Sequence, residues 1–392
     1  MALVEGIAAL EAEMVGWRRA LHAHPELAFA EHDTAARVAD WLRGFGLDPA
    51  VGLAGTGVVA TIEGRRPGPA IALRADLDAL PMTEESGVAH ASKTPGRMHA
   101  CGHDGHMAML LGAAKHLAAT RAFAGRVHVV FQPAEEGGAG GEVMVREGLF
   151  QKFPAEQVFG LHNWPALPAG VFGVRAGPVM AATDTFTITV EGRGGHAAMP
   201  HQTLDPIVGG AQVVLALQSL VSRRLDPAGM AVVSVTVFEA GSAYNVIPAR
   251  AVLRGTVRTV DPSVRDAIEA QMKRLVTGVC DGLGLTGAVD YVRGYPATIN
   301  HAAEAELAAR AAARVVGADK VLRELPPSMG GEDFAYMLGA RPGCYVWMGT
   351  GRGEGTRGLH HPQFDFDDES LVVGASYWVR LVEERLGEAR LG

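Results

Sequence analysis

The sequence predicts an α/β fold with a smaller α+β domain inserted into it, and three observations support this prediction. Four apolar runs alternate with helical patterns in the first half of the chain. From about residue 182 the order of elements becomes strand, helix, strand, strand, helix, strand. The chain has 392 residues, which is long for a single hydrophobic core, so two domains are expected.

The first half has the composition of a sheet covered on both faces. Its strand-like runs are nearly continuous in apolar residues, which is typical of a buried, mainly parallel sheet. The expected strands are 57–64, 70–80, 126–136 and 157–163, and the expected helices are 5–23, 32–45 and 104–120. Asp33 or Thr34 is expected to cap the second helix.

The pattern of elements in the second half of the chain predicts an inserted domain with a ferredoxin-like order. The strand beginning near 184 is followed by a helix (205–223), two strands (230–241 and 249–260), a helix (262–282) and a strand (288–296). A helix at 301–316, an apolar strand and a C-terminal helix then resume the α/β pattern. We therefore expect residues 1–181 and 295–392 to form one discontinuous domain and residues 182–294 to form the insertion.

Charge and cysteine content exclude several functions. The formal net charge is -8 with no basic run, which argues against nucleic acid and an anionic membrane surface as partners. The N-terminus carries Glu5, Glu11 and Glu13, so it resembles an amphipathic helix and not a signal peptide, and no run reaches the roughly 18 apolar residues of a membrane span. Only three cysteines occur, which argues against a disulfide framework and predicts a cytoplasmic location.

Polar side chains follow the predicted strands where an active-site crevice would lie. Asp76 and Asp78 end one run, Glu135 and Glu136 end another, and His162 ends a third. In open α/β sheets the crevice lies outside the carboxyl ends of the strands, so these groups are expected to converge. Neighbouring side chains of an extended chain point opposite ways, so one glutamate could bind a metal while the other faces the substrate as a base.

The segment "CGHDGH" allows several interpretations. Taken alone it is a polar turn in which Asp104 caps the following helix, or Cys101 is a nucleophile with His103 or His162 as its base. Gly102 would also permit a turn that brings the thiolate and imidazole to one cation. Together with one glutamate, His162 and a histidine of the "LHHP" loop, they form a donor set for zinc or a similar ion that is too large for one tetrahedral site, so two ions are expected.

Nine motifs in order resemble a known family between residues 17 and 375. They are "RRALHAHPELAFAEHDTA", "LRADLDALPMTE", "MHACGHDGHMAMLLGAA", "VVFQPAEEGGAGGEVMVREGL", "GLHNWP", "GRGGHAAMPH", "AYNVIPA", "GGEDFAYM" and "LHHPQFDFDDESL". The chain thereby resembles the hippurate hydrolase or N-acyl-amino-acid amidohydrolase subfamily of the aminoacylase and carboxypeptidase clan of co-catalytic metallohydrolases.

This resemblance implies metal-dependent hydrolysis of the amide bond of small N-acyl or N-aroyl amino acids, with a dipeptidase or carboxypeptidase of the same clan as the alternative. It implies two divalent ions, which could be zinc, manganese, cobalt or nickel. It also implies a homodimer or homotetramer formed through the inserted domain.

Carried over by motif, the resemblance also implies a role for individual residues. Cys101 would bridge the two ions and Glu135 would be the general base. The metal ligands would be Cys101, His103, Glu136, His162 and His360, with His361 as the alternative to His360. A non-catalytic relative would lack a ligand or the base, whereas every motif position is filled.

Residues around these ligands are expected to support them. The peptidase branches carry a ligand histidine where this chain has Asp76, so we expect Asp78 to orient a ligating imidazole, while Asp76 could be structural. Asp104 and His106 are expected to cap the helix and support the ligands.

The remaining motif residues lie away from the predicted strand ends. The resemblance places His196 and Asn245 of the insertion near the substrate as hydrogen-bond donors to the oxyanion, and in related enzymes the histidine comes from the partner subunit. Glu332 would line the crevice. His22 and His24 are expected to be structural residues of the N-terminal helix.

Overall fold

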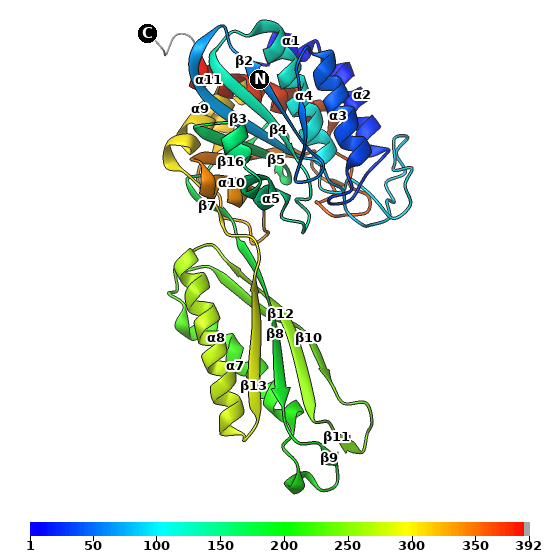
Figure 1. Ribbon diagram of the computed structural model, residues 1–392, viewed down its shortest axis with the longest axis vertical. Coiled ribbons are helices and arrows are strands. Elements are labelled where there is room, and N and C mark those ends of the chain that lie inside the picture. Colours follow the sequence, from blue (N-terminus) through cyan, green and yellow to red (C-terminus); the bar gives the residue numbers. More distant parts are fainter. Residues whose placement is uncertain (388–392) are drawn as a thin grey trace. The chain divides into compact units, whose positions relative to one another are not determined.

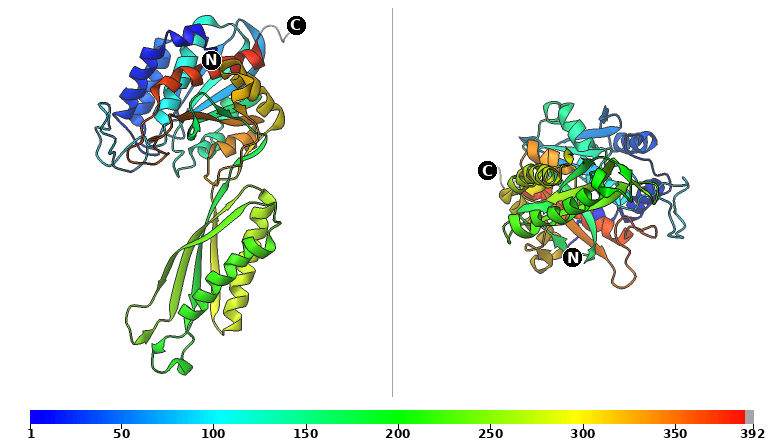
Figure 2. Two further views of the ribbon diagram at one scale, coloured as in Figure 1. Left: turned by 180° about the vertical axis from the view of Figure 1, so that it is seen from behind. Right: turned by 90° about the horizontal axis from the view of Figure 1, so that it is seen from below.

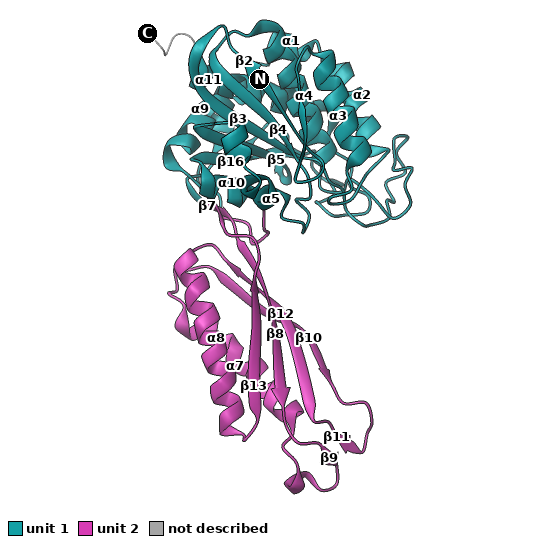
Figure 3. Cartoon of the chain, in the orientation of Figure 1, with its two compact units in different colours: residues 1–177, 299–326, 333–392 teal, residues 178–298, 327–332 magenta. Residues whose placement is uncertain are grey.

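The computed structural model describes residues 1–387 and divides the chain into two compact units (Figure 3). Unit 1 comprises Met1–Gly177, Ile299–Pro326 and Asp333–Gly392, and unit 2 comprises Pro178–Thr298 and Pro327–Glu332. The second unit is thus an insertion into the first, with a short additional segment contributed from further along the chain.

Unit 1 is built on a mixed eight-stranded sheet (Figure 1). Its strands lie in the order β1 (Ala50–Leu53), β2 (Gly57–Glu63), β4 (Ala124–Gln132), β3 (Arg66–Asp76), β5 (Gln157–Pro168), β16 (Gly343–Gly351), β6 (Phe172–Gly173) and β15 (Val321–Leu322). The four central strands β4, β3, β5 and β16 are parallel, whereas β2 and β6 run antiparallel to their central neighbours. The carboxyl ends of the central strands therefore meet at one edge.

Helices cover both faces of this sheet, as alternate side chains of β5 show. Phe159 belongs to the main apolar core beneath α4, whereas a side chain at Gly160 would meet Phe334 of α10 on the opposite face. The layer on the main core consists of α1 (Glu5–Ala8), α2 (Glu11–His22), α3 (His32–Gly44), α4 (His103–Thr120), α9 (Ala302–Val316) and α11 (Leu371–Leu386). The other layer contains α5 (Gly140–Arg146), α6 (Leu149–Lys152) and α10 (Phe334–Ala340). The predicted α/β architecture is confirmed.

Two helix details differ from the prediction. The expected helix 5–23 is two helices, because the chain turns between Ala8 and Glu11. The expectation that Asp33 or Thr34 caps α3 is wrong. Their backbone N–H groups instead donate to the carboxylate of Glu26, at 3.2 and 2.8 Å respectively.

Unit 2 has the ferredoxin-like fold expected from its order of elements. Its elements are β8 (Ala182–Glu191), α7 (Pro206–Arg224), β10 (Ala231–Ala240), β12 (Arg250–Thr259), α8 (Pro262–Gly282) and β13 (Thr286–Arg293). The antiparallel sheet has the order β10-β12-β8-β13, and α7 and α8 pack together on one face of it (Figures 1 and 2). Both helices begin at an aspartate cap, Asp205 and Asp261.

The shorter elements are two ribbons and three 3₁₀ turns. The ribbons are β9 (Gly195–His196) with β11 (Val246–Ile247), and β7 (Gly177–Met180) with β14 (Thr298–Asn300). The turns are Pro200–Gln202, Ala318–Lys320 and Asp368–Ser370. Within the described residues, none of the helices has the length and apolarity required to cross a bilayer.

Candidate metal centre

The parallel strands β4, β3 and β5 bring three of the predicted polar positions to one edge. Asp76 pairs with Gln132 at the end of the β3–β4 ladder, so Glu135 and Glu136 follow immediately beyond that edge. The β3–β5 ladder ends at Arg74 and Gly160, which leaves His162 at the same level as Asp76. His162 does not end its strand, however, because β5 continues to Pro168 along β16.

Gly102 makes the turn that carries Cys101 and His103 into the start of α4. Its φ of +96° lies where side chains are rarely tolerated, and a Cβ there would lie 2.4 Å from Asn163 Oδ1. Only glycine fits both restrictions. The turn brings Cys101 Sγ to 3.4 Å from His162 Nε2, although the two residues are distant in sequence.

Hydrogen bonds to backbone carbonyls fix the orientation of both buried imidazoles. His103 Nδ1 donates to the carbonyl of Asp78 at 2.8 Å, and His162 Nδ1 donates to the carbonyl of Asn163 at 2.7 Å. Since Nδ1 carries the proton in each ring, the neutral form presents the lone pair of Nε2, as a metal ligand requires. Burial, followed by the proximity of His106, lowers the pKa of His162 well below its usual value.

The charge around His103 shows an excess of buried carboxylates. Burial alone would lower the pKa of His103, but Asp76, Asp78 and Glu136 raise it to about 10. For the thiol of Cys101, burial and then the carboxylates of Glu136, Glu135 and Asp76 raise the pKa well above its usual value. Closely assembled anionic donors produce both effects, and a bound cation reverses them.

Glu136 and His360 complete a second group around Cys101. The backbone N–H of Glu136 donates to Asp78 Oδ2 at 2.8 Å, and Glu136 Oε1 lies 3.1 Å from His360 Nε2. His360 is held by its own N–H, which donates to the carbonyl of Ala100 at 2.8 Å, and it adopts a φ of 60°. His361 instead accepts the N–H of Gln363 on its Nδ1.

These donors fall into two groups that share the thiol. Ligand atoms lie within 4.8 Å of one another in the group Cys101, His103 and His162 and in the group Cys101, Glu136 and His360. Glu135 joins His103 and Glu136 in a further such group. Among the described residues, His103 Nε2 is buried without a hydrogen-bond partner, and the buried Glu136 Oε1 has the imidazole of His360 beside it. Buried polar atoms are rarely left without a partner, and these donors therefore fit two cations that share one thiolate.

The surrounding residues hold the donors in place. The backbone carbonyl of Asp78 accepts from His103 Nδ1, and its carboxylate accepts the backbone N–H of Glu136. Asp76 accepts from His106 Nδ1 at 2.6 Å and pairs with Arg74 at the same distance. Asp76 thus links the centre to the sheet.

The expectation that Asp104 caps α4 is wrong. Asp104 is fully buried and pairs with Arg18 Nε and His22 Nδ1, each at 2.8 Å, and no side chain caps the helix. Burial would raise the pKa of Asp104, but Arg18 and His22 hold it well below its usual value. His22 also lies 3.2 Å from Glu84, and His24, just beyond the end of α2, donates from Nδ1 to the carbonyl of Ala20.

Sequence reasoning did not single out several supporting residues. Asn163 contacts His106 Nε2 through its side chain at 2.7 Å and through its backbone N–H at 3.0 Å. Asp333 accepts from Arg74, Gln132 and the N–H of Gly141. Asn163 and Asp333 belong to the motifs "GLHNWP" and "GGEDFAYM". Their positions in these motifs could have identified them as residues near the site.

His196 and Asn245, which were predicted to lie near the substrate, belong to unit 2. His196 and Asn245 lie together because β9 pairs with β11, and the N–H of Ala197 donates to the carbonyl of Asn245 at 3.0 Å. His196 Nδ1 accepts the N–H of Ala198, so its exposed Nε2 carries the proton in the neutral form. Glu332 is buried, and its carbonyl accepts from Thr298.

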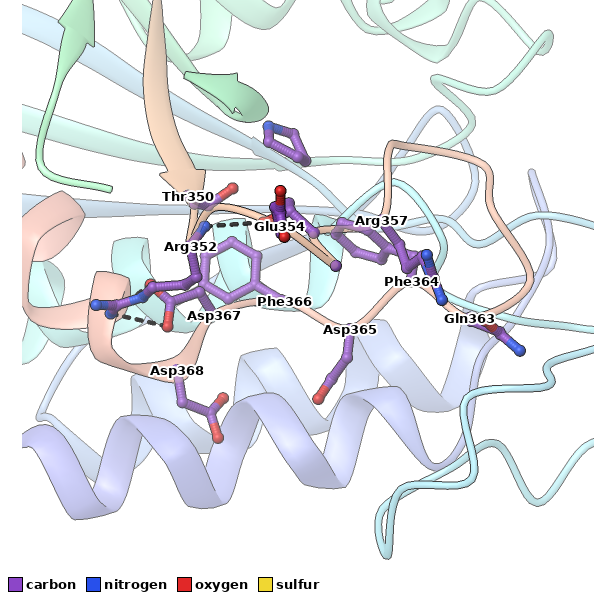
Figure 4. A pocket seen from close by; sticks show the side chains of 13 residues that line it. Thr350, Arg352, Glu354, Arg357, Gln363, Phe364, Asp365, Phe366, Asp367 and Asp368 are labelled. Carbon is purple, nitrogen blue, oxygen red and sulfur yellow. Dashed lines mark hydrogen bonds and ion pairs between the residues drawn. The ribbon is translucent and has the colours of Figure 1, made fainter. Parts of the chain in front are cut away.

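A pocket of about 470 Å³ lies elsewhere on unit 1 (Figure 4). It is bordered by Pro165 and Thr350 and by residues within 352–357 and 363–368, where Arg352 pairs with Asp367. None of the candidate ligands lines it, and its charged residues are already partly paired. The chemistry is therefore assigned to the donor cluster at the strand ends and not to this pocket.

An α/β unit that gathers thiol, imidazole and carboxylate donors for two cations at its strand ends defines the class of co-catalytic metallohydrolases. The chain belongs to peptidase family M20/M25/M40, whose model matches residues 72–384. It is 42% identical to N-acetylcysteine deacetylase of Bacillus subtilis over 95% of this chain and 97% of that protein. It is 36% identical to hippurate hydrolase of Campylobacter jejuni over 97% and 98% of the two chains.

A solved structure agrees with this assignment. The chain is similar to a dinuclear metal-binding M20 peptidase of Bacillus subtilis, with a TM-score of 0.84, 38% identity and coverage of 96% and 98% of the two chains. The family and its two-metal cofactor, expected from the motifs, are confirmed. The protein takes two divalent metal ions.

Proposed function

We propose that this protein hydrolyses the amide bond of N-acyl or N-aroyl amino acids and releases a carboxylic acid and a free amino acid. The observation that carries the proposal is the pair of donor groups that share Cys101, with Glu135, the first glutamate of its pair, beside them. The names of the two relatives, a deacetylase of an N-acetyl amino acid and a hippurate hydrolase, support this substrate class.

The candidate ligands are Cys101, His103, Glu136, His162 and His360. Two divalent ions held there would polarise the scissile carbonyl and lower the pKa of a coordinated water from about 15.7 to roughly 7. Glu135 takes the proton of the attacking water and returns it to the leaving amine. Its neighbour Glu136 would bind metal instead. Asp78 accepts the backbone N–H of Glu136 and thereby fixes the backbone between the two glutamates.

His196 and Asn245 are proposed as donors to the oxyanion that forms on the carbonyl. The tautomer of His196 leaves Nε2–H available, and the β9–β11 ribbon holds the backbones of the two residues close together. One such donor contributes about 2.7 to 4 kcal/mol in other hydrolases.

We further propose a homodimer or homotetramer that forms through unit 2. The apolar side chains of Leu215, Val208 and Val246 on this unit are 74%, 51% and 51% exposed and are available to pack against a second copy. We also propose residence in the cytoplasm, because Cys101, Cys280 and Cys344 are all free and buried.

A hydrolysis screen tests the proposal. The protein is stripped of metal and reconstituted with zinc, manganese, cobalt or nickel, then assayed on N-acetyl amino acids, N-benzoyl amino acids and dipeptides. Activity that is lost with the metal and returns with it, on the first two classes, supports the proposal. Dipeptide hydrolysis alone would favour a dipeptidase, and activity that survives chelation but not alkylation would favour Cys101 as a nucleophile.

A further inference from the structure

The turn that presents the two glutamates has a backbone conformation that alanine rarely adopts. Ala134, directly before Glu135, has a φ of 55° and is fully buried. Left-handed backbone is unfavourable for a residue with a Cβ and persists only where surrounding contacts enforce it. The turn therefore needs a partner that holds Ala134 in this conformation.

Glu31, at the start of α3, is that partner. Its Oε1 accepts the backbone N–H of Ala134 at 2.8 Å, and its Oε2 accepts the hydroxyl of Thr56 at 2.7 Å. The Glu31 side chain is completely buried, so the bond is shielded from water. The carbonyl of Ala134 is fixed as well, because it accepts the N–H of Gly140 at 3.1 Å.

A second buried carboxylate fixes the same turn two residues later. Asp78 Oδ2 accepts the N–H of Glu136 at 2.8 Å, so the N–H groups on both sides of Glu135 donate to buried carboxylates. Burial is the main cause that raises the pKa of Glu31 above its usual value. The turn is therefore held from two sides by acceptors that water does not reach.

We propose that Glu31 is a positioning residue for Glu135. It holds Ala134 in the left-handed conformation and thereby aims the Glu135 carboxylate, while Asp78 holds the Glu136 side of the turn. Without Glu31 the N–H of Ala134 is buried and unpaired, and Ala134 relaxes toward negative φ. That change rotates the peptide before Glu135 and displaces its side chain without removing any metal ligand. The role of Glu135 as base, on which this inference rests, comes from the proposed function.

A double-mutant cycle tests the inference, because glycine adopts positive φ without the Cβ penalty. Glu31→Ala is expected to lower kcat about 100-fold, the effect of a displacement of roughly 1 Å at a reacting group, with two metal ions still bound. Glu31→Gln keeps an acceptor oxygen and is expected to lose less than about tenfold. In the Ala134→Gly background the loss from Glu31→Ala is expected to shrink by at least about fivefold.

Asp184→Asn provides the matched control. Asp184 is a buried carboxylate of unit 2 that pairs with Arg265, so its loss is expected to destabilise the protein while leaving kcat unchanged. If Glu31→Ala does not fold, Glu31→Gln and Thr56→Val carry the same cycle with Ala134→Gly. Equal losses of kcat in both backgrounds, or a folded Glu31→Ala protein with the wild-type kcat, overturn the inference. A wild-type protein that cleaves no N-acyl amino acid overturns the proposed function instead, and the positioning role is then read from amide hydrogen exchange of residues 133–141, which Glu31→Ala must accelerate and Asp184→Asn must not.

Discussion

Substituting Gly102 by alanine is expected to damage both the stability of unit 1 and its metal centre. The residue combines a φ of +96° with a Cβ position 2.4 Å from Asn163 Oδ1 and 2.8 Å from Asn163 Cγ. The backbone conformation costs about 1–2 kcal/mol for a residue with a Cβ. Moving the Asn163 amide breaks its buried contact with His106, which costs about 1–3 kcal/mol more.

The expected loss is therefore roughly 2–5 kcal/mol of unfolding free energy. Since the carbonyl of Asn163 orients His162, metal affinity is also expected to fall about 10- to 100-fold. Gly46→Ala is the matched control, because Gly46 has a φ of +78° with no atom within 4 Å of the added Cβ. It should show the conformational cost alone and bind metal normally.

Urea unfolding followed by tryptophan fluorescence measures this difference for unit 1 alone. All five tryptophans, Trp17, Trp41, Trp164, Trp347 and Trp378, belong to that unit. Metal-free protein is used for stability, and titration with zinc gives the affinity. If the Gly102→Ala and Gly46→Ala proteins unfold within about 1 kcal/mol of each other and bind metal equally, the steric reasoning at Asn163 is refuted.

Three further predictions follow from the same geometry. Glu135→Gln should lower turnover about 10²- to 10⁴-fold on the best substrate while two metal ions per chain remain by elemental analysis, and wild-type turnover would remove Glu135 as the base. Burial alone would lower the pKa of His22, but Asp104 and Glu84 raise it to about 9 from 6.5, so its stabilisation is present below pH 6.5 and is lost as the pH rises through 9. Between these two pH values, the free energy of unfolding in urea should therefore decline less steeply for His22→Gln than for the wild type. The two slopes should differ by up to about 1.4 kcal/mol for each pH increment of one, and parallel curves would contradict this. His360→Ala should reduce bound metal whereas His361→Ala should not, and the reverse result would make His361 the ligand.

The sequence predicted those parts of the fold that depend on local pattern. Apolar runs at 70–80 and 126–136 identified β3 and β4, and the polar residues after them identified the edge where the centre lies. The order of elements after residue 182 was sufficient for the fold of unit 2. These features are set by periodicity and by the geometry common to parallel sheets.

Contacts between distant segments were not predictable in the same way. Asp104 has the sequence context of a helix cap, but Arg18 and His22 lie close enough in the fold to take its carboxylate. The Asp104 carboxylate therefore forms a buried ion pair and does not cap the helix. The residues of "CGHDGH" alone do not predict this, because both partners lie elsewhere in the chain. The extension of β5 beyond His162 has a similar cause, because the partner that continues the ladder, β16, comes much later in the chain.

The sequence predicted which side chains could bind metal in the candidate site. It did not predict the residues that position those side chains. Cysteine, histidine and glutamate are side chains that can bind a metal, and their place after the predicted strands is visible in the sequence. The proposed role of Glu31 depends instead on the backbone N–H of Ala134. Every residue except proline has this group, so the sequence does not reveal which one Glu31 contacts.

The division of the chain into two units separates the candidate metal ligands from the proposed oxyanion donors. Cys101, His103, Glu136, His162 and His360 all belong to unit 1, whereas His196 and Asn245 belong to unit 2. With this assignment, loading with metal depends on unit 1 alone, whereas turnover by the proposed mechanism requires residues of both units. Metal content then reports on unit 1 and does not count active enzyme molecules.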